Sequence, residues 1–351
     1  MQAYADIGIR AAVAPMADDD DLVVQYAKKR GYSLDDTFFA QRHDVRPNID
    51  EQTNIMETFF AKWHNTQNGR LQCLTGPSGI QWCSSEFFEQ QCDLARRYKG
   101  MIHTHVLESE IQAKVCNEVL GKTGIEFLYD CGALGPDVSL AHCVWLTDKD
   151  IDILAETKTM VIHNPAANLK LGSGLAPIRK MLDKGVIVGI GTDGSASSDN
   201  QNMFEMLKLT GLIHNLSYKN ADKWLSAREV VNMATANSGL IMGLYETLGR
   251  IKPDCLADLV LLNLDTPNLT PLNDAYKALV FCETGASVDT VIVNGSIVVK
   301  EGILRTVDEK DLLDEIRTAV RRRGSSCNYL SDDEVNKAIE AFTAFMEHCG
   351  R

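Results

Sequence analysis

The chain has 351 residues, of which 45% are hydrophobic, and its 35 basic residues stand against 48 acidic ones, for a formal net charge of −13. A chain of this length can bury a large core, and its acidity disfavours binding to nucleic acid or to an anionic membrane. No stretch approaches the roughly 18 apolar residues that a membrane-spanning helix needs, and no secretory signal is visible. We therefore expect a folded cytoplasmic protein.

Six short runs rich in β-branched residues, each ending in turn or polar residues, predict strands in the first two hundred residues. They are residues 8–15, 71–78, 100–108, 138–146, 159–165 and 186–194. Most of the segments between these runs have apolar residues at helical spacing, as in residues 84–99, 148–156 and 176–184. Strands that alternate with helices predict a parallel sheet, and this many repeats favour a (β/α)₈ barrel over an open sheet.

The interval between residues 15 and 71 is longer than the others and contains the aromatic pairs Phe38-Phe39 and Phe59-Phe60. An insertion after a barrel strand is a typical place for a lid over the substrate. A pair of additional helices explains the interval equally well.

The sequence changes character after residue 250. Residues 257–262, 290–294 and 296–299 predict short strands, and Asn294-Gly295 is a strong hairpin signal. From residue 308 the pattern is helical and charged. We expect three parts: an incomplete barrel over residues 1–250, a small β domain over 251–305 and a helical tail over 306–351.

The ten cysteines are scattered, and no C-x-x-C pair occurs. This usage is typical of a reduced cytosolic protein, and it argues against a cysteine-based zinc module or a site of the cytidine-deaminase type. Any metal in this protein is therefore expected to be bound by histidine and carboxylate side chains.

Chemically active residues occur near the carboxyl ends of several predicted strands: His105, His142, His163 and Asp193. In a parallel barrel these strand ends open on one face, so we expect the four side chains to converge. A single histidine on an apolar strand is more often a core residue. The prediction of a site therefore rests on the occurrence of all four residues at strand ends.

Glu108 follows His105 in an H-x-x-E pair. The imidazole can hold a metal ion while the carboxylate reaches an activated water. The alternative, a solvated glutamate at the start of a helix, is compatible with that role.

Four strings carry a resemblance to a known family: HTHVLES at 103–109, AHCVWLTD at 141–148, HNPAANLKLGSGLAPI at 163–178 and GTDGSASSDNQNMFE at 191–205. They resemble the metal-dependent amidohydrolase superfamily, in its branch of cytosine, guanine, adenosine-related and triazine deaminases and chlorohydrolases. The segments DCLADLVLLN and DTVIVNGSIVVKEG resemble the composite β domain of that branch. The resemblance runs from about residue 3 to residue 304 with suitable spacing.

The resemblance implies roles for individual residues. His105 corresponds to a metal ligand, Glu108 to the acid/base that shuttles a proton, and His142 to the histidine that hydrogen-bonds the attacking water. Asp193 corresponds to the carboxylate that binds the metal and deprotonates water. His163, Asn164 and Asn168 lie on a loop that approaches the site in the family, which suggests contacts to substrate.

The cofactor implied is one divalent ion, zinc or iron. A binuclear site with a carboxylated lysine is disfavoured, because residues 71–78 contain no lysine.

One part of the family pattern is missing. Members begin with a β segment, and the first barrel strand that follows ends in H-x-H and supplies two metal ligands. This sequence instead opens with residues that resemble the helix and strand three of the barrel. The string His103-Thr104-His105 is not a substitute, because V-L-E follows it and His142 and Asp193 lie at the distances expected from strand five. We therefore expect a barrel without its first strands, with exposed edges and weakened metal binding.

Three explanations fit this departure: an incomplete sequence, which we favour, a split enzyme, or a degenerate protein. The function that the resemblance implies is metal-dependent hydrolysis of a non-peptide C–N bond in a small-molecule substrate, as in deamination of a nitrogen heterocycle by a zinc-activated water. The alternatives are hydrolytic dechlorination of a triazine and a catalytically inactive subunit. The resemblance is also compatible with a homodimer.

Overall fold

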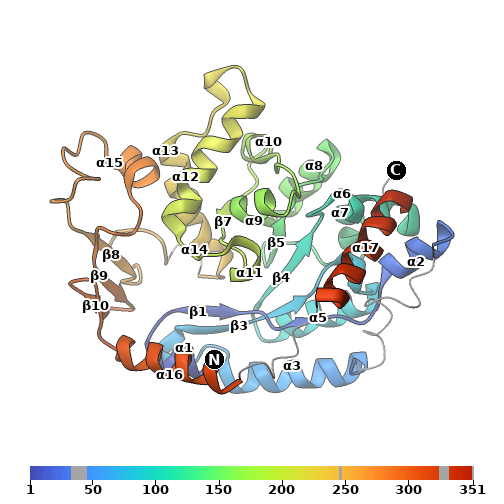
Figure 1. The fold of residues 1–351 in the computed structure, drawn as a ribbon, viewed down its shortest axis with the longest axis horizontal. Helices are drawn as coiled ribbons and strands as arrows, with labels where there is room; N and C mark the ends of the chain where they lie inside the picture. The colour runs from blue at the N-terminus through green and yellow to red at the C-terminus, as the bar shows by residue number, and fades with distance from the viewer. Residues whose placement is uncertain (33–45, 245–246, 324–331, 350–351) are drawn as a thin grey trace.

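The structure is a computed structural model that describes residues 1–32, 46–244, 247–323 and 332–349. Phe38 and Phe39 lie outside the described residues. A curled parallel sheet, covered by helices, occupies the centre, and a small antiparallel sheet lies at one side (Figure 1). The predicted combination of an incomplete α/β barrel with a C-terminal β unit is thus confirmed.

The parallel sheet has the strand order β1-β3-β4-β5-β6-β7, with β2 paired to β3. Its strands are β1 (Ala11–Val13), β2 (Met16–Ala17), β3 (Leu71–Pro77), β4 (Met101–Val106), β5 (Val138–His142), β6 (Met160–His163) and β7 (Val188–Ile190). Every neighbouring pair is parallel, so all the carboxyl ends lie at one edge. Within the described residues β1 and β7 do not pair with each other, and the sheet stays open.

Helices follow the strands as the periodicity predicts. The longer ones around the sheet are α3 (Ile49–Trp63), α5 (Ser85–Arg97), α8 (Asp148–Thr157) and α12 (Met203–Ile213). The shorter ones are α1 (Gln2–Ile7), α2 (Leu22–Lys29), α4 (Thr66–Gly69), α6 (Glu110–Val115), α7 (Gly124–Asp130), α9 (Pro165–Lys170), α10 (Ile178–Asp183), α11 (Ser195–Ser198), α13 (Ala227–Asn232), α14 (Ser238–Ile241) and α15 (Ala275–Lys277).

The core lies between the sheet and these helices. Every residue of β5 is buried, as expected for a central parallel strand covered on both faces. Phe87 and Phe88 of α5 are fully buried in the same cluster as Leu140 and Val161. In the long interval, Phe60 of α3 packs with Cys73 and Leu94, so this part of it forms a helix of the barrel wall.

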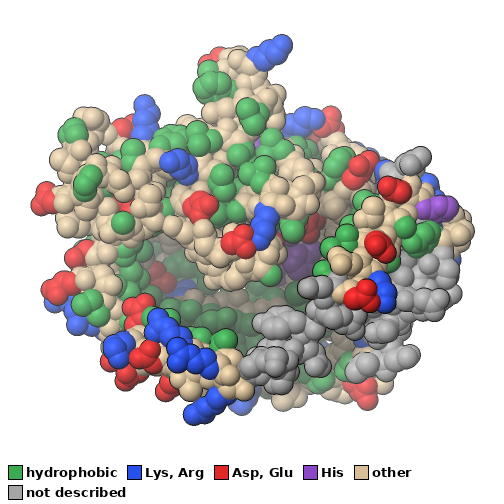
Figure 2. Space-filling model, viewed as in Figure 1, with side chains coloured by type: hydrophobic (Ala, Val, Ile, Leu, Met, Phe, Trp, Pro, Cys, Tyr) green, Lys and Arg blue, Asp and Glu red, His purple; other side chains and the backbone are tan. Residues whose placement is uncertain are grey.

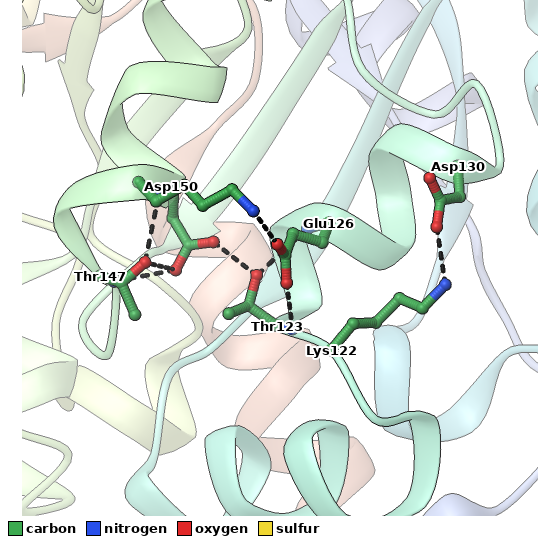
Figure 3. Close-up of polar contacts among 7 residues, drawn as sticks. Lys122, Thr123, Glu126, Asp130, Thr147 and Asp150 are labelled. Carbon is green, nitrogen blue, oxygen red and sulfur yellow. Dashed lines mark hydrogen bonds and ion pairs between the residues drawn. The ribbon is translucent and has the colours of Figure 1, made fainter.

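Hydrogen bonds tie together the starts of α7 and α8 (Figure 3). Thr123 and Glu126 form a capping box at α7, and Thr147 and Asp150 form one at α8. Thr123 Oγ1 also donates to Asp150 Oδ1 at 2.5 Å, although Asp150 is fully buried. The buried carboxylate therefore caps its own helix and anchors the neighbouring one.

The second sheet is antiparallel with the order β11-β10-β9-β8. Its strands are β8 (Leu259–Leu262), β9 (Val288–Val293), β10 (Ser296–Lys300) and β11 (Ile303–Leu304). Asn294 and Gly295 join β9 to β10 with φ values of 51° and 82°, the conformation that the Asn-Gly pair predicts. Arg10 Nε contacts Asp258 Oδ2 at 2.6 Å and links this sheet to the N-terminal segment.

Two helices form the tail, α16 (Glu309–Arg323) and α17 (Asp332–Cys349). Phe345 of α17 is buried against Leu22 and Tyr26 of α2, and the two helices lie side by side in Figure 1. In contrast, every residue from 309 to 322 on α16 is exposed. None of the described helices is long and apolar enough to cross a membrane.

Candidate active site

Three of the predicted residues meet at the carboxyl edge of the parallel sheet. Glu108 follows β4, His142 ends β5 and Asp193 follows β7. One potential ligand atom from each of them lies within 4.8 Å of the other two. His142 is buried, whereas Glu108 and Asp193 are partly exposed, so the cluster combines a sheltered imidazole with two carboxylates open to a ligand. In Figure 2 histidine side chains are visible inside the central hollow of this face.

Left-handed backbone conformations occur at these strand ends. The φ value is 48° at Leu107, 75° at His142, 51° at Cys143 and 61° at Asp193. In regular register His142 is paired with Val106 and Ala141 with His105, which assigns His105 and His142 to opposite faces of the sheet. Their rings nevertheless stack with centroids 5.7 Å apart. Left-handed non-glycine residues are uncommon, and four of them occur at this edge of the sheet.

His105 lies outside the three-residue cluster, although its ring stacks on that of His142. Its Nδ1 atom is 2.7 Å from the carbonyl oxygen of Ser78. A carbonyl can only accept, so Nδ1 carries the proton and Nε2 keeps its lone pair. This arrangement is typical of a metal-ligating histidine, whose second nitrogen donates to a backbone carbonyl or a carboxylate.

The loop after β6 contacts the side chains of His142 and Glu108. Asn168 Oδ1 lies 2.8 Å from His142 Nδ1, and Ser173 Oγ donates to Glu108 Oε1 at 3.2 Å. His142 Nδ1 and Glu108 Oε1 are 3.7 Å apart. Ser173 was not among the residues that the sequence pointed to; its position between Gly172 and Gly174, in a loop downstream of the His163 motif, was the available signal.

His163 does not join the cluster. It is fully buried, and its Nε2 atom lies 3.1 Å from Nε2 of His214, which follows α12. Burial and then the neighbouring His214 hold the pKa of His163 well below its ordinary value, and burial lowers the pKa of His214 to about 4. No sequence motif pointed to His214, because its partner lies 51 residues away.

Asn164 and Asn168, the other two predicted substrate contacts, lie on the same loop and are both buried. Asn164 is the residue before the first turn of α9, and Asn168 lies within α9. His103 points to Ser139 Oγ at 2.9 Å, and burial, followed by the charge of His105, lowers its pKa to about 4. His103 is thus a neutral, partly exposed residue of β4.

The donor set suits a divalent ion such as zinc. Besides thiolate sulfur, the usual ligands of zinc are imidazole nitrogen and carboxylate oxygen. The cluster offers one imidazole and two carboxylates. His105 presents a second imidazole lone pair next to His142. The described residues therefore fit part of a metal shell.

A model of the amidohydrolase family matches residues 6–298. The chain belongs to the amidohydrolase family. Among its relatives is a 5'-deoxyadenosine deaminase of Methanosarcina acetivorans, 39% identical over 270 residues, which are 77% of this chain and 62% of that protein. A 5-methylthioadenosine/S-adenosylhomocysteine deaminase of Clostridium tetani is 37% identical over 271 residues, 77% of this chain and 61% of that protein. This amidohydrolase chain thus spans about three fifths of the length of these relatives.

Solved structures of the family agree with the fold. Atrazine chlorohydrolase of Arthrobacter aurescens, complexed with zinc, has a TM-score of 0.80 and 30% identity over 90% of this chain and 67% of its own. An adenosine deaminase of Xanthomonas campestris with bound zinc has a TM-score of 0.76 over 92% of this chain and 68% of its own. The second likeness, at 23% identity, shows the fold alone.

Proposed function

We propose that this amidohydrolase hydrolyses a C–N bond in a nitrogen heterocycle, and that it deaminates the adenine ring of a nucleoside modified at its 5' position. The cluster of Glu108, His142 and Asp193 supports the proposal, because potential ligand atoms of two carboxylates and an imidazole lie within 4.8 Å of one another. The names of the nucleoside deaminases that share 37–39% identity with the chain support the substrate class.

His105 and Asp193 are the proposed metal ligands, and the proposed ion is zinc, as in the chlorohydrolase structure. When bound, the ion supplies Lewis acidity, which lowers the pKa of a water molecule toward 7. Asp193 accepts a proton from the attacking water, and His142 orients that water. Glu108 donates a proton to the ring nitrogen next to the carbon under attack as the new C–O bond forms. The proton held by Asp193 then passes to the exocyclic amino group, the hydroxyl proton of the adduct returns to Glu108, and the C–N bond breaks to release ammonia.

The sequence predicted that His163, Asn164 and Asn168 contact the substrate. In the proposal this loop only shapes the substrate site. His163 and Asn168 are engaged with His214 and His142, and all three side chains are buried. They define the wall behind the reacting centre, while residues on the open side would contact the nucleoside.

A second function is hydrolytic dechlorination of a triazine. The 30% identity to a solved atrazine chlorohydrolase supports it, and the same pair of carboxylates can activate water against a ring C–Cl bond. The third possibility is a catalytically inactive subunit.

The protein expressed from its complete coding sequence separates these functions. Zinc content is measured by atomic emission. Ammonia release is assayed with 5'-deoxyadenosine and 5'-methylthioadenosine, and chloride release is assayed with a chlorotriazine. Our proposal expects zinc together with ammonia release from the nucleosides. Chloride without ammonia supports the second function, and a protein without metal or turnover contradicts both.

We further propose a second copy of the chain as a partner, through α16. Its fully exposed surface carries an apolar stripe, Leu312, Ile316 and Val320, and an isolated helix of this length is marginal in water. The acidic side chains Asp311, Asp314 and Glu315 precede the basic Arg317, Arg321 and Arg322. Antiparallel pairing of two α16 helices would place each acidic half against a basic half.

We also propose that the chain divides into three parts at residues 250 and 305. A cytoplasmic location is a further part of the proposal. The change from parallel to antiparallel strands after α14 supports the first boundary. Eight of the described cysteines are not disulfide-bonded, and six of them are buried, which supports a reducing compartment.

A further inference from the structure

The loop after β6 reaches the two side chains that the proposed reaction uses for proton transfer. Asn168 contacts His142, and Ser173 contacts Glu108. Trp145 Nε1 donates to the carbonyl oxygen of Ser173 at 2.7 Å, so the loop is itself anchored to the segment after β5. Asn168 and Ser173 are 2% and 6% exposed, which leaves both contacts sheltered from water.

We infer that Asn168 and Ser173 are positioning residues that fix the proton of His142 on Nδ1 and reserve one oxygen of Glu108 for the substrate. This inference rests on the proposed function for its catalytic consequence, but its structural part can be measured without substrate. Neither residue touches the reacting atoms; each acts through its partner.

Two acceptors face His142 Nδ1. Asn168 Oδ1 lies 2.8 Å away and Glu108 Oε1 lies 3.7 Å away. If the side-chain amide of Asn168 were rotated by 180°, its NH₂ group would point at His142 Nδ1, which would then have to carry a lone pair. That lone pair would also face the Glu108 carboxylate, and the two would repel each other. The carboxylate favours the Nδ1–H tautomer, which leaves Nε2 of His142 with a lone pair. Nε2 of His142 can consequently accept a hydrogen bond from a water molecule but cannot donate one.

Contacts on one side also hold the Glu108 carboxylate. Ser173 Oγ and the Nδ1 side of His142 both lie at the same atom, Oε1. The second oxygen, Oε2, is left for proton transfer. The Glu108 side chain is 20% exposed, so this oxygen has access to a ligand at the mouth of the sheet.

The test is the tautomer of His142, read from the ¹⁵N chemical shifts of its ring in the metal-free full chain at neutral pH. The His142→Gln variant identifies the signal. We expect the Nδ1–H tautomer in the unmodified protein and in Ser173→Ala, and a shift toward the Nε2–H form in Asn168→Leu. Asn168→Asp, which keeps the acceptor, should retain Nδ1–H. A dominant Nε2–H form in the unmodified protein would overturn the inference.

Kinetics give the second readout. Asn168→Leu and Ser173→Ala should each lower kcat about 10- to 100-fold with little change in KM, as expected for partners that orient a catalytic group. The matched control is Thr210→Val, a buried polar side chain outside the site, which should alter neither tautomer nor kcat. If kcat of both variants is unchanged, the catalytic part is contradicted. A correct tautomer without any ammonia release would contradict the proposed function and leave the tautomer assignment standing.

Discussion

Glu108 is the residue on which the proposed chemistry depends most. It lies within reach of His142 and Asp193, and it is partly exposed at the mouth of the sheet. We predict that Glu108→Gln lowers the rate of ammonia release by about 10²- to 10⁴-fold, because the amide cannot transfer the proton. The matched control is Glu110→Gln, two residues along on the exposed start of α6. Similar rates in both variants would exclude Glu108 as the acid/base.

The His163–His214 pair predicts a pH dependence of stability. Both pKa values are lower in the folded protein than the ordinary value of 6.5, and that of His214 falls to about 4. As the pH falls from 6.5 toward 4, the unfolded chain binds protons that the folded chain does not, so the folded state loses stability. For His214 this loss is on the order of 2 kcal/mol between pH 7 and pH 5.

Urea titrations at the two pH values measure this loss. The His214→Asn variant should show a smaller pH effect than the unmodified protein, whereas His348→Gln, on the surface-exposed part of α17, should show the full effect. An unchanged pH effect in His214→Asn would show that the pair titrates in the folded state as it does in the unfolded one.

At the scale of elements, periodicity predicted which segments form strands and helices, since burial on one or both faces leaves a regular apolar pattern. The strand predicted for residues 138–146 ends at His142, because the left-handed φ at His142 and Cys143 turns the chain. The same local geometry places the His142 ring beside His105. Such conformations have no periodic signature, so the sequence could predict that these residues meet at one edge but not how they contact each other.

The capping network of α7 and α8 gives a prediction at this scale. Asp150→Ala removes acceptors for Thr147 and Thr123 in a fully buried site, and we expect it to lower the free energy of unfolding by about 2–3 kcal/mol. Asp148→Ala, on the same helix but with a side chain that is 80% exposed, should cost less than about 1 kcal/mol. Urea denaturation compares the two, and equal losses would contradict the assigned role of Asp150.

For the whole molecule, the open sheet and the exposed helix α16 are the features that composition alone did not reveal. The resemblance predicted a barrel without its first strands, and β1 and β7 indeed form the two ends of the described sheet. Which surfaces stay exposed depends on tertiary packing: α17 is covered through Phe345, whereas α16, of similar amphipathic pattern, has no buried residue among 309–322.

Self-association through α16 is testable by light scattering. We predict that the unmodified chain is dimeric and that Ile316→Glu, in the apolar stripe, yields the monomer mass, because it places a charge in the paired surface. Thr318→Glu is the matched control, since a residue two positions along a helix points away from that stripe. A monomer before any substitution would refute pairing through α16.

The central claim is that the Glu108, His142 and Asp193 edge belongs to a zinc-dependent nucleoside deaminase. Its most direct test is ammonia release per bound zinc, measured with 5'-deoxyadenosine on the protein from its complete coding sequence, before and after removal of the metal. We predict turnover that is lost with the metal and restored by zinc. Turnover that survives metal removal, or a zinc-loaded protein that releases no ammonia, would contradict the claim.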